Sequence, residues 1–351
     1  MKYNTLNQTD IKVSEICLGT MTYGMQNDKK DAFQQLDYAT DNGINFIDTA
    51  ELYSIPAVNF ETFGRTEEYI GKWIKHKKNR DKLVLSTKVL GPTTGSIIKQ
   101  SRPNPNPLTK DTINEALNKS LIRLYTDYID LYQIHWPLRP TNYFGHLNYT
   151  HVEVSFDIQA QILDTIVTMN DLIKQGKIRH YGLSNETAWG VMTFIRLACE
   201  NNLIAPITVQ NPYSLLNRSY EVGLAEVSMH ENVGLLAYSP LACGALSGKH
   251  VNGVQKNTRV SLYPEYFTRY TNPQALLATK AYHDLSLEVG IELTHMALAF
   301  INKQPFLTSN IIGATKMNQL EQCITSINTE LSPDIMQNIE EIHILYPFPA
   351  P

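Results

Sequence analysis

Four residues with different chemistry stand close to the ends of short apolar runs in the first half of the chain. Asp48, Lys88 and His135 each end or follow such a run, and Tyr53 lies shortly after Asp48. Apolar runs of this length, bounded by turn or helix signals, are typical of buried parallel strands. Because polar residues at the carboxyl ends of parallel strands face the place where ligands bind, we expect the four side chains to meet. A carboxylate, a phenol, an amine and an imidazole together can control the transfer of one proton, which indicates an enzyme.

The chemistry of the four groups favours protonation of a carbonyl oxygen. Tyr53 carries the only hydroxyl of the set, although an unperturbed phenol, with a pKa of about 10, is a slow proton donor at neutral pH. A neighbouring ammonium lowers that pKa, which is the role we expect for Lys88. Asp48 can pair with Lys88 and offset the cost of burying its charge. His135 can hydrogen-bond the substrate oxygen and orient the carbonyl while a second molecule delivers hydride.

Each of these residues also has an ordinary structural explanation when it is taken alone. Asp48 can cap the turn that follows it, Lys88 can be a solvated charge at a strand end, and His135 can be a buried histidine with satisfied hydrogen bonds. Tyr53 can be a packing aromatic residue. Their joint position at successive strand ends is what favours a catalytic site.

The alternation of apolar runs and helical patterns along the chain predicts a barrel. Two segments at 1–6 and 11–16, separated by a polar turn, predict an N-terminal β-hairpin. Strand-like runs then alternate with helical patterns that carry apolar residues at i, i+3 and i+4 spacing. The runs lie at 16–19, 44–48, 83–88, 128–135, 180–184, 207–210, 233–238 and 309–312. Eight such units are the number in a (β/α)8 TIM barrel, an α/β fold.

Further features of the sequence complete the predicted fold. Helical patterns at 275–289 and 333–344 predict extra C-terminal helices outside the eightfold repeat. An open doubly wound sheet is the alternative, but the first turn from strand to helix, at 18–24, has no G-x-G-x-x-G phosphate loop. No linker or composition shift divides the chain, so we predict a single domain over residues 1–351.

Several connections are longer than a compact barrel needs. They lie at 54–64, 90–108, 136–154 and 239–272. Because each follows the carboxyl end of a predicted strand, we expect all of them on the catalytic face.

The composition excludes several other classes of protein. Hydrophobic residues make up 43% and charged residues 18%, as in an ordinary globular protein, and the formal net charge is −4. The scattered Lys and Arg make no continuous basic field, so we expect no nucleic-acid partner. No apolar stretch approaches the ~18–20 residues of a membrane span, and the first residues lack a signal-peptide core. Four dispersed cysteines without a C-x-x-C pair indicate reduced thiols and a cytoplasmic protein, not a disulfide framework or a zinc site.

The segments around the four residues resemble the aldo-keto reductase superfamily, and the likeness covers nearly the whole chain. Residues 43–53 (GINFIDTAELY) look like the family's signature around its aspartate and tyrosine. Residues 86–88 (STK) and 130–135 (DLYQIH) match the lysine and histidine segments. A finer likeness, in 139–142 (RPTN) and 210–218 (QNPYSLLNR), is to the Tas-type bacterial enzymes and to their relatives, the potassium-channel β-subunits.

This resemblance implies an activity and a cofactor. It makes the four residues a catalytic tetrad, with Tyr53 as the general acid. It implies an enzyme that reduces aldehyde and ketone carbonyls of small molecules to alcohols by hydride transfer. NADPH or NADP+ is the implied cofactor, and no metal is implied.

The implied dinucleotide site follows the later strands. Hydroxyl and amide side chains at Ser184 and Gln210 suit a nicotinamide carboxamide, and Tyr238 can offer its ring face to the nicotinamide. Small residues in 239–249 let the backbone approach a pyrophosphate. The implied cofactor-binding residues are Ser184, Asn185, Gln210, Tyr238, Ser239, Leu241, Gly244, Leu246, Gly248, Lys249, Arg259, Gly313, Thr315, Gln319 and Gln322.

The adenosine end of this site departs from many family members. Gln319 stands where an arginine is frequent, and Cys323 where an asparagine is common. Arg259 matches an arginine of the channel β-subunit group, and its guanidinium can donate two hydrogen bonds to a phosphate and stack on adenine. The alternative for Arg259 is a solvated loop arginine. We predict that NADPH binds more tightly than NADH.

Two other classes of function remain open at this point. A regulatory protein that holds the nucleotide with little turnover is suggested by the channel β-subunits, and turnover on simple aldehydes would distinguish it from an enzyme. A metal-dependent hydrolase on the same barrel needs several His and Asp ligands at strand ends, and only Asp48 and His135 qualify. The sequence does not give the physiological substrate or the oligomeric state.

Overall fold

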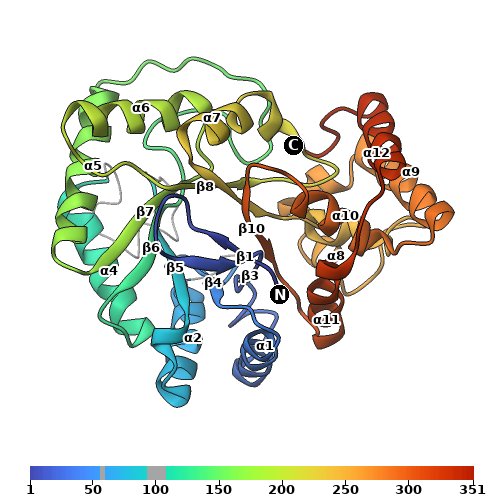
Figure 1. Cartoon of the computed structure of the whole chain (residues 1–351), viewed down its shortest axis with the longest axis horizontal. Coiled ribbons are helices and arrows are strands. Elements are labelled where there is room, and N and C mark those ends of the chain that lie inside the picture. Colours follow the sequence, from blue (N-terminus) through green and yellow to red (C-terminus); the bar gives the residue numbers. More distant parts are fainter. Residues whose placement is uncertain (56–59, 93–107) are drawn as a thin grey trace.

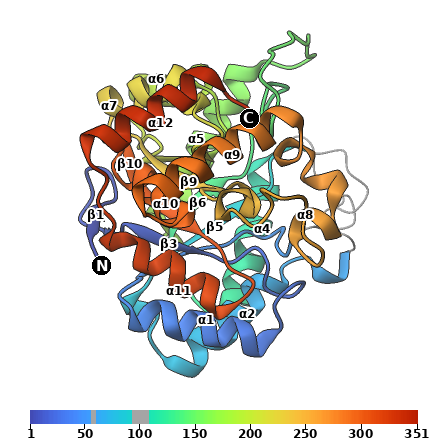
Figure 2. The ribbon, with the colours of Figure 1, turned by 90° about the vertical axis from the view of Figure 1, so that its right-hand side faces the viewer.

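The computed structural model, which describes residues 1–55, 60–92 and 108–351, confirms the predicted barrel (Figure 1). Eight parallel strands are hydrogen-bonded in the order β3-β4-β5-β6-β7-β8-β9-β10, and β10 pairs with β3 to close the ring. Helices lie around the outside of these strands (Figures 1 and 2). A separate antiparallel pair, β1 and β2, forms the predicted hairpin.

The strands are short, and the helices alternate with them. The strands are β1 (Tyr3–Thr5), β2 (Lys12–Ser14), β3 (Ile16–Gly19), β4 (Phe46–Asp48), β5 (Val84–Val89), β6 (Ile129–Ile134), β7 (Ile178–Ser184), β8 (Thr208–Pro212), β9 (Gly234–Tyr238) and β10 (Leu307–Ile312). The α-helices are α1 (Lys29–Asp41), α2 (Arg65–Lys77), α4 (Lys110–Leu124), α5 (Ile158–Lys174), α6 (Ala188–Glu200), α7 (Leu224–Glu231), α8 (Arg259–Leu262), α9 (Pro273–Val289), α10 (Leu293–Asn302), α11 (Met317–Thr325) and α12 (Pro333–Leu345). Short 3-10 helices lie at Phe60–Thr62, Arg80–Lys82, Ser219–Val222, Ala242–Ser247, Pro264–Tyr266, Thr268–Tyr270 and Ser326–Asn328. Within the described ranges, no helix is long and apolar enough to cross a membrane.

The register of the strands aligns several polar residues inside the barrel. Asp48 on β4 pairs with Ser86 on β5, and Lys88 pairs with Gln133 on β6. Because side chains alternate between the two faces of a strand, Ser86 and Lys88 point to the same side. His135 comes two residues after Gln133 and therefore continues that side beyond the carboxyl end of β6.

The hairpin covers the amino-terminal end of the barrel. Its Leu6, Ile11 and Val13 are buried in one apolar cluster with strand residues that include Phe46 and Leu131. Figure 1 shows β1 and β2 lying across the barrel strands. The opposite, carboxyl-terminal end of the strands is where the polar residues collect.

The extra C-terminal helices have clear start signals. Asn272 and Ser332 cap α9 and α12 by accepting a backbone N–H, and a proline begins each helix. The two helices contact each other at one side of the barrel (Figure 1). They confirm the helices predicted at 275–289 and 333–344.

The predicted element ends differ from the observed ones by a few residues. The strand predicted at 44–48 covers only Phe46–Asp48, and both hairpin strands are shorter than predicted. The connection at 239–272 is not a plain loop, because α8 and three 3-10 helices lie within it. Most of the predicted connection 90–108 lies outside the described residues, as does part of 54–64.

Candidate active site

Asp48 and Lys88 form a buried ion pair inside the barrel. Lys88 Nζ lies 2.5 Å from Asp48 Oδ2 and donates a second hydrogen bond, of 2.8 Å, to the carbonyl oxygen of Thr49. Neither charged side chain is more than 3% exposed. Burial acts to lower the pKa of Lys88, but the attraction of Asp48 and Tyr53 outweighs it and the pKa is raised. Lys88 therefore stays charged at neutral pH.

The ring of Tyr53 lies between Lys88 and His135. Lys88 Nζ is 5.0 Å from the centroid of the Tyr53 ring, and the His135 ring meets that ring edge-on with 5.7 Å between centroids. Burial raises the pKa of the Tyr53 hydroxyl, and the charge of Lys88 offsets only part of this rise. The predicted effect of Lys88 is therefore present, but the net change in the Tyr53 pKa is a rise, because burying a phenolate costs more than one ammonium returns. The hydroxyl keeps its proton at neutral pH.

The imidazole of His135 is buried and uncharged. Burial lowers its pKa well below the usual value, and the charge of Lys88 lowers it further. Its Nδ1 has no hydrogen-bond partner among the described residues. A neutral imidazole can donate one hydrogen bond and accept another, so this ring can bind an oxygen placed next to Tyr53.

Two glutamines complete the set of donors around Asp48. Gln210 Nε2 donates to Asp48 Oδ1 at 2.9 Å, and Gln133 Nε2 approaches the same oxygen at 3.3 Å. Gln133 also donates to Ser86 Oγ at 2.7 Å. Gln133 and Ser86 were not among the predicted site residues. Side chains alternate between the two faces of β5 and β6, so Gln133 lies on the same side as His135, and Ser86 on the same side as Lys88.

Asn185 connects the carboxyl ends of several strands. Its Nδ2 donates to the backbone oxygen of His135 at 2.8 Å and to Ser184 Oγ at 3.1 Å, and its Oδ1 accepts from Tyr238 Oη at 2.6 Å. Ser184 Oγ donates in turn to the backbone oxygen of Gln210 at 2.9 Å. Asn185 has a φ of 56°, in the left-handed region that asparagine tolerates. The structure thus brings the four predicted nicotinamide residues together beside Asp48 and His135.

The segment after β9 turns sharply. Its residues with positive φ are Ser239, Ala242, Cys243, Gly244 and Gly248. Successive turns of this kind can direct backbone N–H groups into a concavity that suits an anion. Leu241 and Leu246 pack on the core and hold the segment in place. Gly244 has a φ of 97°, which favours glycine, and a Cβ there would lie 2.6 Å from Lys249 Nζ, so the ammonium lies close to the backbone of this segment.

Three cations gather beside this segment. Burial lowers the pKa of Lys249, and repulsion by Arg259 and Lys316 lowers it further. None of the three takes part in an ion pair among the described residues. Arg259 Nε does donate to Gln26 Oε1 at 3.3 Å. Like charges held together without a partner favour the binding of an anion. Lys249 and Arg259 are among the predicted cofactor-binding residues, and Lys316 directly follows the predicted Thr315.

The residues predicted for the adenosine end divide into two groups. Residues 313–316 follow β10, and Thr315 donates from its backbone N and its Oγ1 to Gln319 Oε1 at 3.0 and 3.1 Å. Gln319 and Thr315 therefore lie together beside Lys316. Gln322, three residues after Gln319 on α11, instead donates to the carboxylate of Glu292.

Apolar side chains surround Tyr53. Leu52, Leu90 and Trp136 form a buried cluster, and Tyr53 and Tyr143 pack against it. Trp136 and Tyr143 belong to the connection predicted at 136–154, so part of that connection does border the candidate site.

Comparison with known proteins identifies the family. Residues 15–344 match the model of the Aldo/keto reductase family. The protein is 47% identical over 352 residues, the whole of both chains, to Protein tas of Escherichia coli strain K12. It is 32% identical to the uncharacterized oxidoreductase YrpG of Bacillus subtilis, over 100% of this chain and 97% of that one. It is 28% identical to a probable voltage-gated potassium channel subunit beta of Arabidopsis thaliana, over 97% and 96% of the two chains. The chain belongs to the aldo/keto reductase family, and this membership supports an oxidoreductase.

Proposed function

We propose that the protein is an NADP(H)-dependent oxidoreductase that reduces the carbonyl of an aldehyde or ketone to an alcohol, with Tyr53 as general acid. The observation that carries this proposal is the position of Lys88, which contacts both Asp48 and Tyr53 at the carboxyl end of the barrel. Membership of the aldo/keto reductase family supports oxidoreduction. The geometry supports the choice of proton donor.

In the proposed reaction, the carbonyl oxygen lies between the Tyr53 hydroxyl and the His135 imidazole. A bound nicotinamide supplies hydride to the carbonyl carbon. Negative charge then develops on the oxygen, and Tyr53 Oη donates its proton there. Because His135 is uncharged, it stabilises the oxygen by a hydrogen bond and leaves the proton transfer to Tyr53.

Lys88 and Asp48 support this proton transfer without touching the substrate. Once Tyr53 has given up its proton, the adjacent ammonium of Lys88 stabilises the tyrosinate. Asp48 holds Lys88 in place, and the two glutamines that donate to Asp48 fix the position of its carboxylate. The tetrad is therefore proposed as one acid, one hydrogen-bonding ring and one buried ion pair.

The residues for the dinucleotide fit a nicotinamide adenine dinucleotide phosphate. We assign Ser184, Asn185 and Tyr238 to the nicotinamide end, where amide and hydroxyl groups meet an aromatic ring. The turns of 239–249 suit the pyrophosphate. Gln210, whose amide donates to Asp48, would border a nicotinamide held by these residues.

Three cations beside the segment 239–249 favour the phosphorylated cofactor. Lys249, Arg259 and Lys316 form a positive cluster that a 2′-phosphate would neutralise. This cluster supplies the charge that the sequence lacks at Gln319, where many relatives have an arginine.

The direct test is a turnover assay on purified protein. NADPH is mixed with a panel of small aldehydes and ketones, and loss of nicotinamide absorbance is followed. We expect reduction of at least one class of carbonyl by the unmodified protein, and near-complete loss in Tyr53→Phe. Reduction that is equally fast in Tyr53→Phe would contradict the assigned donor.

The alternative is a regulatory protein that binds the dinucleotide with little turnover. The 28% identity to a protein named as a potassium channel subunit beta supports this alternative. The arrangement of Tyr53 beside Lys88 and His135 favours turnover instead. Tight NADPH binding without reduction of any carbonyl in the panel would favour the regulatory function.

We extend the proposal to the whole chain. We propose that residues 1–351 act as one domain in the cytoplasm on a small-molecule substrate, without a metal, a nucleic acid or a membrane as partner. The span of the family match, 15–344, and the free state of all four cysteines support this. Among the described residues, no group of three or more His, Cys, Asp or Glu side chains is placed to hold a metal ion.

A further inference from the structure

A buried ion pair joins the loop after β6 to the turn after β7. Arg139 Nη2 donates to Glu186 Oε1 at 2.8 Å, and Nη1 donates to Glu186 Oε2 at 3.1 Å. The side chains are 7% and 2% exposed. Two parallel hydrogen bonds between a guanidinium and a carboxylate fix both distance and orientation. The two segments are therefore held at a defined separation.

The surroundings of the pair fix it further. Glu186 Oε1 accepts the backbone N–H of Thr187, at the start of α6, and Arg139 Nη2 donates to Thr187 Oγ1 at 2.9 Å. A Cβ at Gly190 would lie 2.1 Å from Glu186 Oε1, so the glycine makes space for the carboxylate. The Arg139 guanidinium lies 4.5 Å from the ring centroid of Trp189. Both carboxylate oxygens of Glu186 and both terminal nitrogens of Arg139 therefore have hydrogen-bond partners within these two segments.

The same two segments carry residues of the candidate active site. Glu186 directly follows Asn185, whose Nδ2 donates to the backbone oxygen of His135 at 2.8 Å. The loop and the turn are consequently connected twice, at His135 with Asn185 and at Arg139 with Glu186. Asn211 on β8 fixes the backbone of Glu186 by accepting its N–H at 3.1 Å and donating to its carbonyl at 2.9 Å. The loop after β6 begins at His135, which is assigned to the substrate, and the turn after β7 begins at Asn185, which is assigned to the nicotinamide.

We propose that Arg139 and Glu186 are positioning residues that set the distance between the substrate carbonyl at His135 and the nicotinamide at Asn185. This inference rests on the proposed function, because it assigns those ends of the site. Neither residue touches the reacting atoms. Hydride transfer depends steeply on the separation of its two carbons, so a small displacement of the loop relative to the turn lowers the rate. Arg139 occurs in the quoted segment RPTN, and the active-site chemistry gives it no other role.

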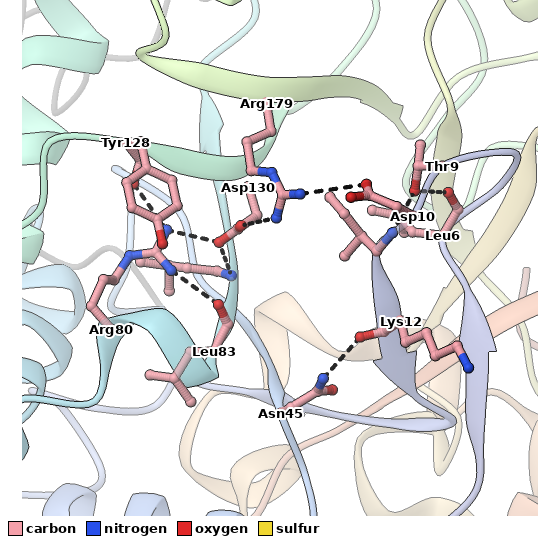
Figure 3. Close-up of polar contacts among 12 residues, drawn as sticks. Leu6, Thr9, Asp10, Lys12, Asn45, Arg80, Leu83, Tyr128, Asp130 and Arg179 are labelled. Carbon is pink, nitrogen blue, oxygen red and sulfur yellow. Dashed lines mark hydrogen bonds and ion pairs between the residues drawn. The ribbon is translucent and has the colours of Figure 1, made fainter.

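A matched control exists at the other end of the barrel. Arg80 Nη2 donates to Asp130 Oδ2 at 2.7 Å, and the Arg80 guanidinium lies 4.0 Å from the ring centroid of Tyr128. The side chains of Arg80 and Asp130 are 14% and 2% exposed, compared with 7% and 2% for Arg139 and Glu186. Figure 3 shows this arginine, its carboxylate and the aromatic ring, with Arg179 on the other side of Asp130. Arg80→Met thus removes a partly buried arginine that is also paired with a buried carboxylate and stacked on a ring, but at the end of the barrel away from the candidate site.

The experiment compares Arg139→Met, Glu186→Gln and Arg80→Met with the unmodified protein. Single-turnover hydride transfer is measured at saturating NADPH and carbonyl, and is repeated with NADPH deuterated at the transferred position. We expect Arg139→Met and Glu186→Gln to slow hydride transfer by about 10- to 100-fold. The steady-state deuterium isotope effect should rise, because the chemical step becomes limiting. Arg80→Met should keep a hydride-transfer rate within about twofold of the unmodified protein, even if its melting temperature falls as far as those of the other two variants.

A double variant tests whether the two residues act as one unit. Hydride transfer in Arg139→Met/Glu186→Gln should be no slower than in the slower single variant, since both changes break the same ion pair. Glu186→Gln also serves if Arg139→Met does not fold, because it keeps the size of the side chain and removes only its charge. Unchanged hydride transfer in Glu186→Gln, or an equal loss in Arg80→Met, would overturn the proposal. A complete lack of carbonyl reduction by the unmodified protein would instead contradict the proposed function.

Discussion

Lys88 Nζ lies 2.5 Å from Asp48 Oδ2, and this ion pair is closed off from solvent. The other carboxylate oxygen of Asp48 accepts hydrogen bonds from Gln210 and Gln133. All the charge of the pair is therefore matched within the barrel. Removing one partner leaves the other buried without its counter-charge, which is much more destabilising than removing both.

The first prediction follows from that asymmetry. Lys88→Met should abolish turnover and lower the free energy of unfolding by about 3–5 kcal/mol, the usual cost of leaving one charge of a buried pair. Lys88→Met/Asp48→Asn should recover part of the stability but none of the activity. Urea denaturation and the carbonyl reductase assay measure the two quantities. A double variant that is no more stable than Lys88→Met would contradict the proposed charge balance.

The second prediction concerns the proton donor. Tyr53→Phe keeps the ring and removes the hydroxyl, so kcat should fall by at least about 10²-fold while NADPH affinity stays nearly constant. Tyr143→Phe removes a hydroxyl from the same apolar cluster and is the control. If the two variants lost activity equally, the hydroxyl of Tyr53 would have no special role.

The third prediction concerns the choice of cofactor. Arg259→Ala should weaken NADPH binding by roughly ten- to over a hundredfold, the equivalent of about 1.5–3 kcal/mol for a charge-assisted contact, and should change NADH binding little. Arg196→Ala, which removes an exposed arginine paired with Glu200, is a control with the same change in charge. Dissociation constants from fluorescence titration provide the comparison. Equal affinity for NADPH and NADH in the unmodified protein would reject the assignment of Arg259.

The fourth prediction is a dependence of stability on pH. The pKa of His135 is lowered in the folded protein, whereas the unfolded chain has the ordinary value of about 6.5. As the pH falls below about 6.5, the unfolded chain takes up a proton that the folded protein does not, so the free energy of unfolding decreases. His135→Gln should lose less stability than the unmodified protein over the same fall in pH. Denaturation curves at pH about 8 and about 5 give the two differences. Parallel losses in the two proteins would show that His135 contributes nothing to this dependence.

The fifth prediction concerns the loop after β6. Replacing residues 143–147 with a Gly/Ser segment of equal length should change KM and the ranking of carbonyl substrates, because Tyr143 packs in the cluster around Tyr53. NADPH affinity should change much less. A similar replacement of residues 7–10, in the hairpin turn at the other end of the barrel, should leave the ranking unchanged. Identical rankings in both variants would place the substrate elsewhere.

The strand order and the strand-end residues were predictable because their signals are local. Asp48, Lys88 and His135 follow apolar runs, and parallel strands must present such ends on one face. Gln133 could also have been predicted, since it lies on β6 two positions before His135 and therefore faces the same side. The short helices of 239–272 could not be predicted, because isolated single turns have no periodicity to detect.

The contacts between distant segments could not be predicted from this one sequence. Arg139 and Glu186 are separated by 47 positions, and no local pattern shows that they meet. The net rise in the pKa of Tyr53 could not be predicted for a related reason. The sequence shows that an ammonium is near, but the extent of burial depends on packing around the whole ring.

The hairpin across the amino-terminal end of the barrel has a consequence for turnover. Leu6, Ile11 and Val13 are buried there in an apolar cluster with Phe46 and Leu131, so packed side chains close much of that end of the barrel. After each reduction, we expect Tyr53 to regain its proton from the carboxyl-terminal side, by which the alcohol leaves. Product release and reprotonation of Tyr53 would then use the same route, so slow product release would delay both.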